Sequence, residues 1–163
     1  MSISFVSGNL FTYDGLEAIC HGCNCKGLMG AGIAKEIKEK FPKMHRYYQD
    51  MCAEGEFILG SVFMAHKFDT SAPYVEEIQQ SGFSTIYNLA TQNHPGPYAS
   101  LKAIKDSVTT MIDDAEQSGI KTIGVPRLGA GIGGLDWNNV KRLLEELGNA
   151  TPVELIVFEE FVK

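Results

Sequence analysis

The sequence predicts a three-layer α/β/α sandwich whose central sheet is mixed, mostly parallel and built from about six strands. Apolar, β-branched runs bounded by turn residues recur along the chain, and stretches with helical periodicity separate them. Strands that alternate with helices are typical of a mostly parallel sheet covered on both faces. A length of 163 residues, without repeats or a linker, is typical of one domain. We therefore expect a single domain over residues 1–163.

Six short apolar runs are expected to form the strands. They cover residues 2–6, 17–21, 60–66, 85–90, 121–125 and 152–158. Between the third and fourth runs, residues 68–82 are polar and carry no clear period. This segment is expected to form an excursion or an edge hairpin.

Three stretches have the spacing of an amphipathic helix. Residues 32–41 place apolar side chains on one stripe, and Pro42 is expected to end this helix. Residues 100–118 form the longest periodic stretch, which Gly119 closes. A third helix is expected to follow Asp136, which is well placed to cap it.

The composition favours a soluble protein that binds neither membranes nor nucleic acid non-specifically. The hydrophobic share of 44% and the charged share of 21% are ordinary for a globular protein. A net charge of −6 argues against non-specific contact with polyanions. No run approaches the roughly 18 apolar residues of a transmembrane span, and the N-terminus lacks the pattern of a signal peptide. We expect a cytoplasmic protein with reduced cysteines.

A glycine-rich loop near the C-terminal end carries the strongest functional signal. Residues 125–137 read VPRLGAGIGGLDW and lie between an apolar run and the third helix. Glycines let a ligand approach the main chain closely, and a helix start offers N–H groups and a positive dipole end to an anion. The loop has neither the Lys-Ser/Thr of a P-loop nor G-x-G-x-x-G spacing. It predicts a site for phosphate or pyrophosphate.

A second loop repeats this arrangement near the N-terminal end. Residues 21–34 read HGCNCKGLMGAGIA and lie between a strand and a helix. Ligands of open α/β sheets bind beyond the carboxyl ends of the strands, so two such loops can clamp one ligand with two phosphates. The alternative is that the glycines only allow tight turns between strand and helix.

Together, the two loops resemble the macrodomain family, whose members bind ADP-ribose. The resemblance begins at residues 6–11 (VSGNLF), passes through both loops and ends on the strand at 153–158. The string at 21–34 looks like the branch that contains ADP-ribose-1″-phosphate phosphatases and terminal ADP-ribose glycohydrolases. The string PRLGAGIGGLDW at 126–137 also resembles the macrodomain antitoxins that remove ADP-ribose from DNA.

The resemblance implies a set of substrate-binding residues. Asn9 stands where most members place an aspartate that accepts a hydrogen bond from adenine, and Asn24 matches the asparagine that binds the distal ribose. Phe158 is a candidate for packing against adenine, or alternatively a core aromatic. The full set comprises Asn9, Leu10, Asn24, Met29, Gly30, Ala31, Gly32, Ile33, Thr91, Leu128, Gly129, Ala130, Gly131, Ile132, Gly133 and Phe158.

The same resemblance implies His21 and Asn24 as the catalytic residues. The glycohydrolase branch uses a lysine and an aspartate, at positions that hold Gln92 and Gly133 here. A glutamine amide nitrogen has no free lone pair with which to attack C1″, so covalent lysine chemistry is not expected. His21 matches a histidine of the phosphatase branch, where an imidazole can position water or donate a proton. The alternative is a histidine that hydrogen-bonds the backbone at a strand end.

Other reactive side chains near the loops allow simpler explanations. Cys20, Cys23 and Cys25 lack the second ligand pair of a zinc site, so we expect buried thiols, no metal and no cofactor. Arg127 can reach a phosphate or serve as a surface ion-pair partner. His94 lies in a loop that should border the same crevice and is a second candidate for contact with the ligand.

Three functions follow from these features. The leading hypothesis is hydrolysis of ADP-ribose-1″-phosphate to ADP-ribose and phosphate. The second is removal of ADP-ribose from modified protein or nucleic acid through a bound water. The third is a non-catalytic reader or sequestering module. The expected partner is ADP-ribose or a small derivative, joined under the second hypothesis by an ADP-ribosylated macromolecule.

Overall fold

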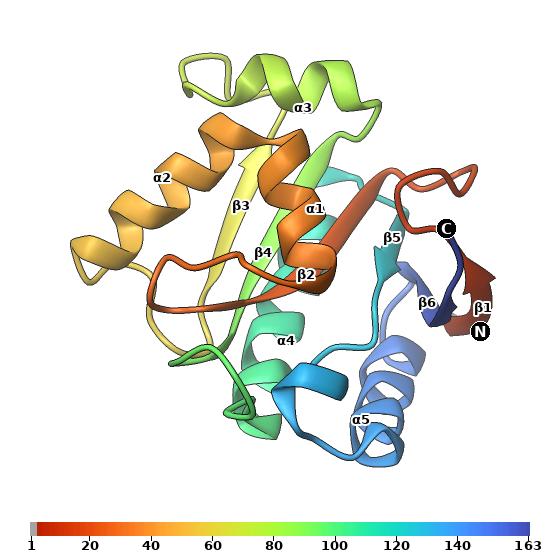
Figure 1. Cartoon of the computed structure of the whole chain (residues 1–163). Coiled ribbons are helices and arrows are strands. Elements are labelled where there is room, and N and C mark those ends of the chain that lie inside the picture. Colours follow the sequence, from red (N-terminus) through yellow and green to blue (C-terminus); the bar gives the residue numbers. More distant parts are fainter. Residues whose placement is uncertain (1–2) are drawn as a thin grey trace.

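The computed structural model describes residues 3–163 and contains a six-stranded sheet between two layers of helices (Figure 1). The strands are β1 (Ile3–Gly8), β2 (Ala18–Asn24), β3 (Val62–His66), β4 (Thr85–Gln92), β5 (Thr122–Val125) and β6 (Glu154–Phe161). Their order across the sheet is β1-β6-β5-β2-β4-β3, and among these strand pairs of residues 3–163 only β3–β4 is antiparallel. The predicted fold class is therefore confirmed. Residue 2, the expected start of the first strand, lies outside the described range.

Helices cover both faces of the sheet (Figure 1). On one face lie α1 (Gly32–Lys40), α2 (Pro42–Ala53) and α3 (Val75–Ser81), and on the other lie α4 (Leu101–Ser118) and α5 (Trp137–Asn149). Ile37, Met44 and Ile78 are fully buried in the first of two apolar cores, whereas Ile104 and Val140 are fully buried in the second. Within residues 3–163, no helix is long and apolar enough to cross a membrane.

Two helices were not anticipated by the sequence-based prediction. Residues 68–82 were expected to form an excursion or hairpin, but they contain α3. Pro42 does follow the end of α1, and it also occupies the first turn of α2, where its missing N–H costs nothing. The Glu77 carboxylate of α3 accepts hydrogen bonds from the N–H groups of Lys43 (2.9 Å) and Met44 (3.0 Å). This contact joins two helices that are distant in the sequence, so a local sequence pattern could not predict it.

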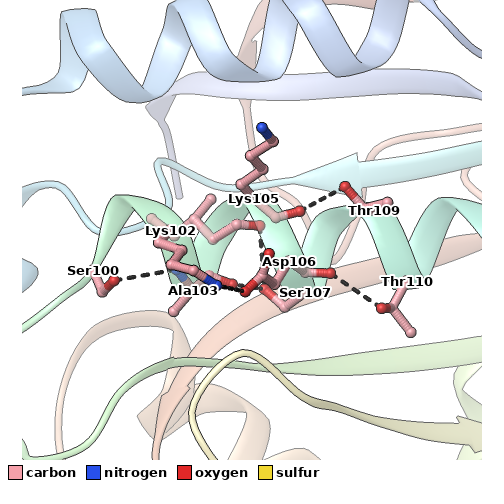
Figure 2. Close-up of polar contacts among 9 residues, drawn as sticks. Ser100, Lys102, Ala103, Lys105, Asp106, Ser107, Thr109 and Thr110 are labelled. Atoms are coloured by element: carbon pink, nitrogen blue, oxygen red, sulfur yellow. Dashed lines mark hydrogen bonds and ion pairs between the residues drawn. The ribbon is translucent and has the colours of Figure 1, made fainter.

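Polar side chains fix the start of α4, as Figure 2 shows. Ser100 caps the helix by accepting a hydrogen bond from the N–H of Ala103 at 3.2 Å. An ion pair joins Lys102 Nζ to Asp106 Oδ2 at 2.7 Å one turn further on. The Ser100 N–H also donates to the carbonyl oxygen of Thr91 at 2.9 Å, which ties α4 to the end of β4.

The topology brings the carboxyl ends of three parallel strands to one edge. β2 is central, because it pairs with β4 on one side and with β5 on the other. β2 continues directly into the loop at residues 25–31, and β5 into the loop at 126–136. Both glycine-rich loops therefore emerge side by side from the same edge of the sheet.

Close packing beneath these loops gives a first prediction, for the variant Gly124→Ala. A methyl group there would lie 2.7 Å from the Cδ1 atoms of both Leu10 and Leu16 in the core. Overpacking should lower the free energy of unfolding by about 1–3 kcal/mol in urea denaturation. Gly30→Ala is the control, because a methyl group at Gly30 meets nothing within 4 Å. Equal urea midpoints for the two variants would contradict the close packing of Gly124 against Leu10 and Leu16.

Candidate functional site

A cleft of about 510 Å³ lies between the two glycine-rich loops. Its wall combines the ends of β2 and β4 with the start of α1, the loop at 95–96 and the loop at 126–133. The cleft brings together most of the residues that the sequence implied. Those that line it are His21, Asn24, Gly30, Ala31, Gly32, Ile33, Thr91, Leu128, Gly129, Ala130, Ile132 and Gly133.

Five implied residues do not line this cleft. Leu10 and Met29 are buried in the core. Phe158 is also buried, with the ring of Tyr13 edge-on to it at a centroid distance of 5.2 Å. Asn9 accepts a hydrogen bond from the N–H of Phe11 at 2.8 Å, and Gly131 begins the short 3₁₀ helix η1 (Gly131–Gly133). The adenine-binding roles of Asn9 and Phe158 stay predictions.

The start of α1 offers unoccupied donors to the cleft. Ala31 stands at the N-cap and has no side-chain oxygen, so within the described residues no side chain caps this helix. The N–H groups of the first turn of a helix have no intrahelical partner. Gly32, Ile33 and Ala34, which supply this turn, all line the cleft. These donors and the positive dipole end of the helix suit an anion.

The second loop approaches from the opposite wall. Gly129 has φ of +70°, and a Cβ atom there would lie 2.7 Å from Ile104 Cδ1. This position therefore requires glycine for both its conformation and its packing. The loop continues into η1, which also has no side-chain cap. Like those of α1, the first N–H groups of η1 have no hydrogen-bond partner within the helix.

Asn24 shapes the first loop with its own side chain. Its Oδ1 accepts from the N–H of Lys26 (2.9 Å), the N–H of Leu28 (3.3 Å) and the hydroxyl of Tyr48 (3.1 Å). Its Nδ2 donates to the carbonyl oxygen of Leu28 at 2.6 Å. An amide nitrogen carries two hydrogens, so one remains for a ligand in the cleft. Asn24 can therefore both hold the loop and bind a hydroxyl.

His21 is held in the core as a neutral imidazole. Its side chain is 1% exposed, and Nε2 lies 2.6 Å from Asn88 Oδ1. Because Asn88 Nδ2 donates to the carbonyl of Phe63 at 3.2 Å, its Oδ1 faces the imidazole and Nε2 must be the protonated nitrogen. Burial lowers the pKa of His21 to about 4, although the Asn88 hydrogen bond opposes this and nearby His45 adds to it. At neutral pH His21 has no proton to spare for a phosphate ester.

Among the described residues that line the cleft there is no carboxylate and no amine. Arg127 is the only fully charged side chain among them, and its guanidinium lies 5.2 Å from the centre of the Trp137 ring. Burial keeps the Cys23 thiol neutral by raising its pKa. Gln92 and Gly133 both line the cleft, and Gln92 Nε2 donates to backbone carbonyls of the loop at 93–97. The positions expected for a lysine and an aspartate thus hold a neutral amide and a glycine.

Metal ligands do not gather in the part of the chain that the structure describes, where no three His, Cys, Asp or Glu side chains lie close enough to share an ion. Within that range the four cysteines are free, with Cys20 and Cys23 buried. The expectation that the protein needs no metal or cofactor stays a prediction.

Sequence reasoning missed two residues that support the site. Tyr48 reaches Asn24 from α2, a helix that was not anticipated, and it also donates to the Asn24 carbonyl oxygen at 2.7 Å. Asn88 binds His21 from within β4 and is fully buried. A polar side chain inside an apolar strand needs a hydrogen-bond partner, so the sequence around Asn88 could have indicated a buried polar contact. No such pattern surrounds Tyr48.

Comparisons with known proteins show what the chain as a whole is similar to. The model of the Macro domain matches residues 20–144. The DNA ADP-ribosyl glycohydrolase of Mycobacterium tuberculosis is 31% identical over 157 residues, which are 96% of this chain but 42% of that protein. The ADP-ribose 1″-phosphate phosphatase of Lodderomyces elongisporus is 26% identical over 157 residues, which cover 90% of this chain and 93% of that protein.

The fold of a solved structure is also similar to that of this chain. The macrodomain of DarG from Mycobacterium tuberculosis matches with a TM-score of 0.80 and 29% identity, covering 99% of this chain and 97% of that one. The chain spans about two fifths of the length of the first DNA ADP-ribosyl glycohydrolases that it matches, but most of the length of the phosphatase.

The buried His21 predicts a pH-dependent stability. Its pKa is about 4 in the folded state and near 6.5 when unfolded, so between these values the unfolded chain binds more protons. Stability should be full above pH 6.5 and should fall toward pH 4, by an amount on the order of 3 kcal/mol at most. His21→Gln, which keeps a donor toward Asn88, should unfold in urea with a shallower pH dependence. Equal slopes for the two proteins would contradict the burial of an uncharged His21.

Proposed function

Because the chain belongs to the Macro domain family, we propose that its cleft binds ADP-ribose and hydrolyses ADP-ribose 1″-phosphate to ADP-ribose and inorganic phosphate. The observation that carries this proposal is the composition of the cleft wall. The uncapped start of α1, the loop at 126–133 with Ile132 and Gly133 of η1, and one arginine line the cavity, and the described lining contains no carboxylate. Such a wall suits a ligand with several phosphates.

The pyrophosphate is proposed to lie between the two loops. The first turn of α1 supplies N–H groups from one side, and the loop at 129–133 supplies them from the other. Arg127, at the edge of the same cleft, adds a positive charge. The remaining Nδ2 hydrogen of Asn24 is available to a ribose hydroxyl.

Hydrolysis of a phosphomonoester is compatible with a wall that lacks an ionised base. Phosphoryl transfer depends mostly on positioning and on stabilisation of negative charge, with little covalent chemistry for the protein to perform. The loop N–H groups and Arg127 can provide both. His21 enters this proposal as a support that fixes β2 against β4 through Asn88, and not as a proton donor.

A second candidate is removal of ADP-ribose from modified DNA. The similarity to DNA ADP-ribosyl glycohydrolases at 31% identity favours it. The cleft wall counts against it, because Gln92 and Gly133 provide neither an amine nor a carboxylate for attack at C1″. This reaction would have to proceed through a bound water.

The reaction itself gives the next prediction. The purified protein should release phosphate from ADP-ribose 1″-phosphate in multiple turnovers, and it should act more slowly on ADP-ribosylated DNA and on an ADP-ribosylated peptide. Phosphate release and free ADP-ribose are measured in parallel. Faster release of ADP-ribose from DNA would favour the second candidate. Tight ADP-ribose binding without any turnover would contradict hydrolysis and indicate a reader or sequestering module.

Gly30 allows the anion site to be tested by a single charge. A Cβ atom added at Gly30 meets no heavy atom within 4 Å, and Gly30 lines the cleft, so Gly30→Glu adds a negative charge at the cleft wall. Calorimetry should show ADP-ribose binding weakened at least about tenfold relative to Gly30→Gln, which has the same shape but no charge. Equal affinities for the Glu and Gln variants would show that the ligand's phosphates lie elsewhere.

A further inference from the structure

We propose that Gln92 is a positioning residue that orients the attacking water in the hydrolysis of the 1″-phosphate. This inference rests on the proposed function and names the group that directs the nucleophile. Gln92 ends β4, and in the sheet register it pairs with Asn24 at the end of β2. Both residues line the cleft.

The hydrogen bonds of Gln92 determine which way its amide points. Its Nε2 donates to the carbonyl oxygens of His94 at 2.6 Å and of Gly96 at 3.0 Å. Both partners are acceptors, so the nitrogen must face them and both of its hydrogens are used. Oε1 is consequently turned away from that loop, toward Gly133, and lies 3.5 Å from where a Cβ of Gly133 would be.

Oε1 is the best-placed side-chain acceptor in the cleft wall. His21 and Thr91 also line the cleft, but they are only 1% and 2% exposed. Asn24 Oδ1 already accepts from two N–H groups and the Tyr48 hydroxyl. Gln92 is half-buried, and its Oε1 accepts no hydrogen bond from another residue in the described range.

Water needs an acceptor of this kind to be held as a nucleophile. A water that donates one hydrogen to a fixed amide oxygen has its lone pair directed away from that oxygen, toward the substrate, as glutamine does in some phosphoryl-transfer enzymes. The cleft of about 510 Å³, which Gln92 lines, leaves room for this water.

The reaction balances without a protein base. The water oxygen forms a bond to phosphorus, and the bond from phosphorus to the anomeric oxygen breaks, leaving its electron pair on that oxygen. A proton of the water passes to the phosphoryl group, and the anomeric oxygen gains a proton from the phosphoryl group or solvent. ADP-ribose and inorganic phosphate are the products. Gln92 neither gains nor loses a proton.

A purely structural role for Gln92 predicts different behaviour. The amide also holds the loop at 93–97, whose Asn93 carbonyl accepts from the N–H of Cys25 at 3.3 Å. If this support were its only task, any variant that loses the Nε2 donors would be impaired alike. A carboxylate facing two carbonyl oxygens would be at least as harmful as an apolar side chain.

The experiment compares Gln92→Leu with Gln92→Glu, since both lose the Nε2 donors but only the second keeps an acceptor oxygen. Gln92→Leu should lower kcat for phosphate release about 100-fold, while the Kd for ADP-ribose changes less than about threefold. Gln92→Glu should keep kcat within about tenfold of the wild-type value. It should also add an acid limb to its kcat–pH profile near the ordinary pKa of a glutamate, about 4.3.

The other outcomes separate the two proposals. Equal losses of kcat in both variants, with no new limb in the pH profile, would overturn the role of Gln92 and leave the phosphatase activity intact. Full activity of Gln92→Leu would do the same. Absence of phosphate release by the wild-type protein would overturn the proposed reaction itself, and the orientation of water with it.

Discussion

Backbone N–H groups at the starts of α1 and η1 are the constraint on which the cleft depends. Neither start has a side-chain cap in the described range, and Ala31 stands where serine or aspartate would ordinarily satisfy these donors. Unsatisfied donors cost free energy unless water or a ligand meets them. The proposed pyrophosphate between the loops would satisfy both sets at once. The missing caps are therefore consistent with N–H groups that bind a ligand, and they do not help to stabilise the helices.

Side-chain amides hold the loops that carry these donors. Asn24 folds the first loop onto itself and is anchored by Tyr48 from α2. Gln92 holds the loop at 93–97, and the N–H of Ala99 just beyond it donates to the carbonyl of Gly133 at 3.1 Å. Amides suit this task because they bond to both N–H and carbonyl groups while remaining neutral. Amides therefore add no negative charge that would repel an anionic ligand from the cleft wall.

Local patterns were sufficient for the fold class and for the two loops. Short β-branched runs and the long apolar period of α4 depend on neighbouring residues, so they can be read directly from the chain. The start of α2 depends instead on Glu77, more than thirty residues away, and α3 is too short to show a clear period. The site follows the same rule. The glycine strings indicated the cleft, but the neutral state of His21 depends on Asn88 and on burial, which only the packed structure reveals.

The most direct test of the central claim is an ADP-ribose titration followed by amide ¹H–¹⁵N NMR. If the ligand's phosphates satisfy the uncapped helix starts, the largest shift changes should fall on the amides of Gly32, Ile33 and Ala34 and on those of η1, with the two groups shifting together at one affinity. Changes confined to other surfaces, or no saturable change at all, would contradict the assignment of this cleft as the binding site.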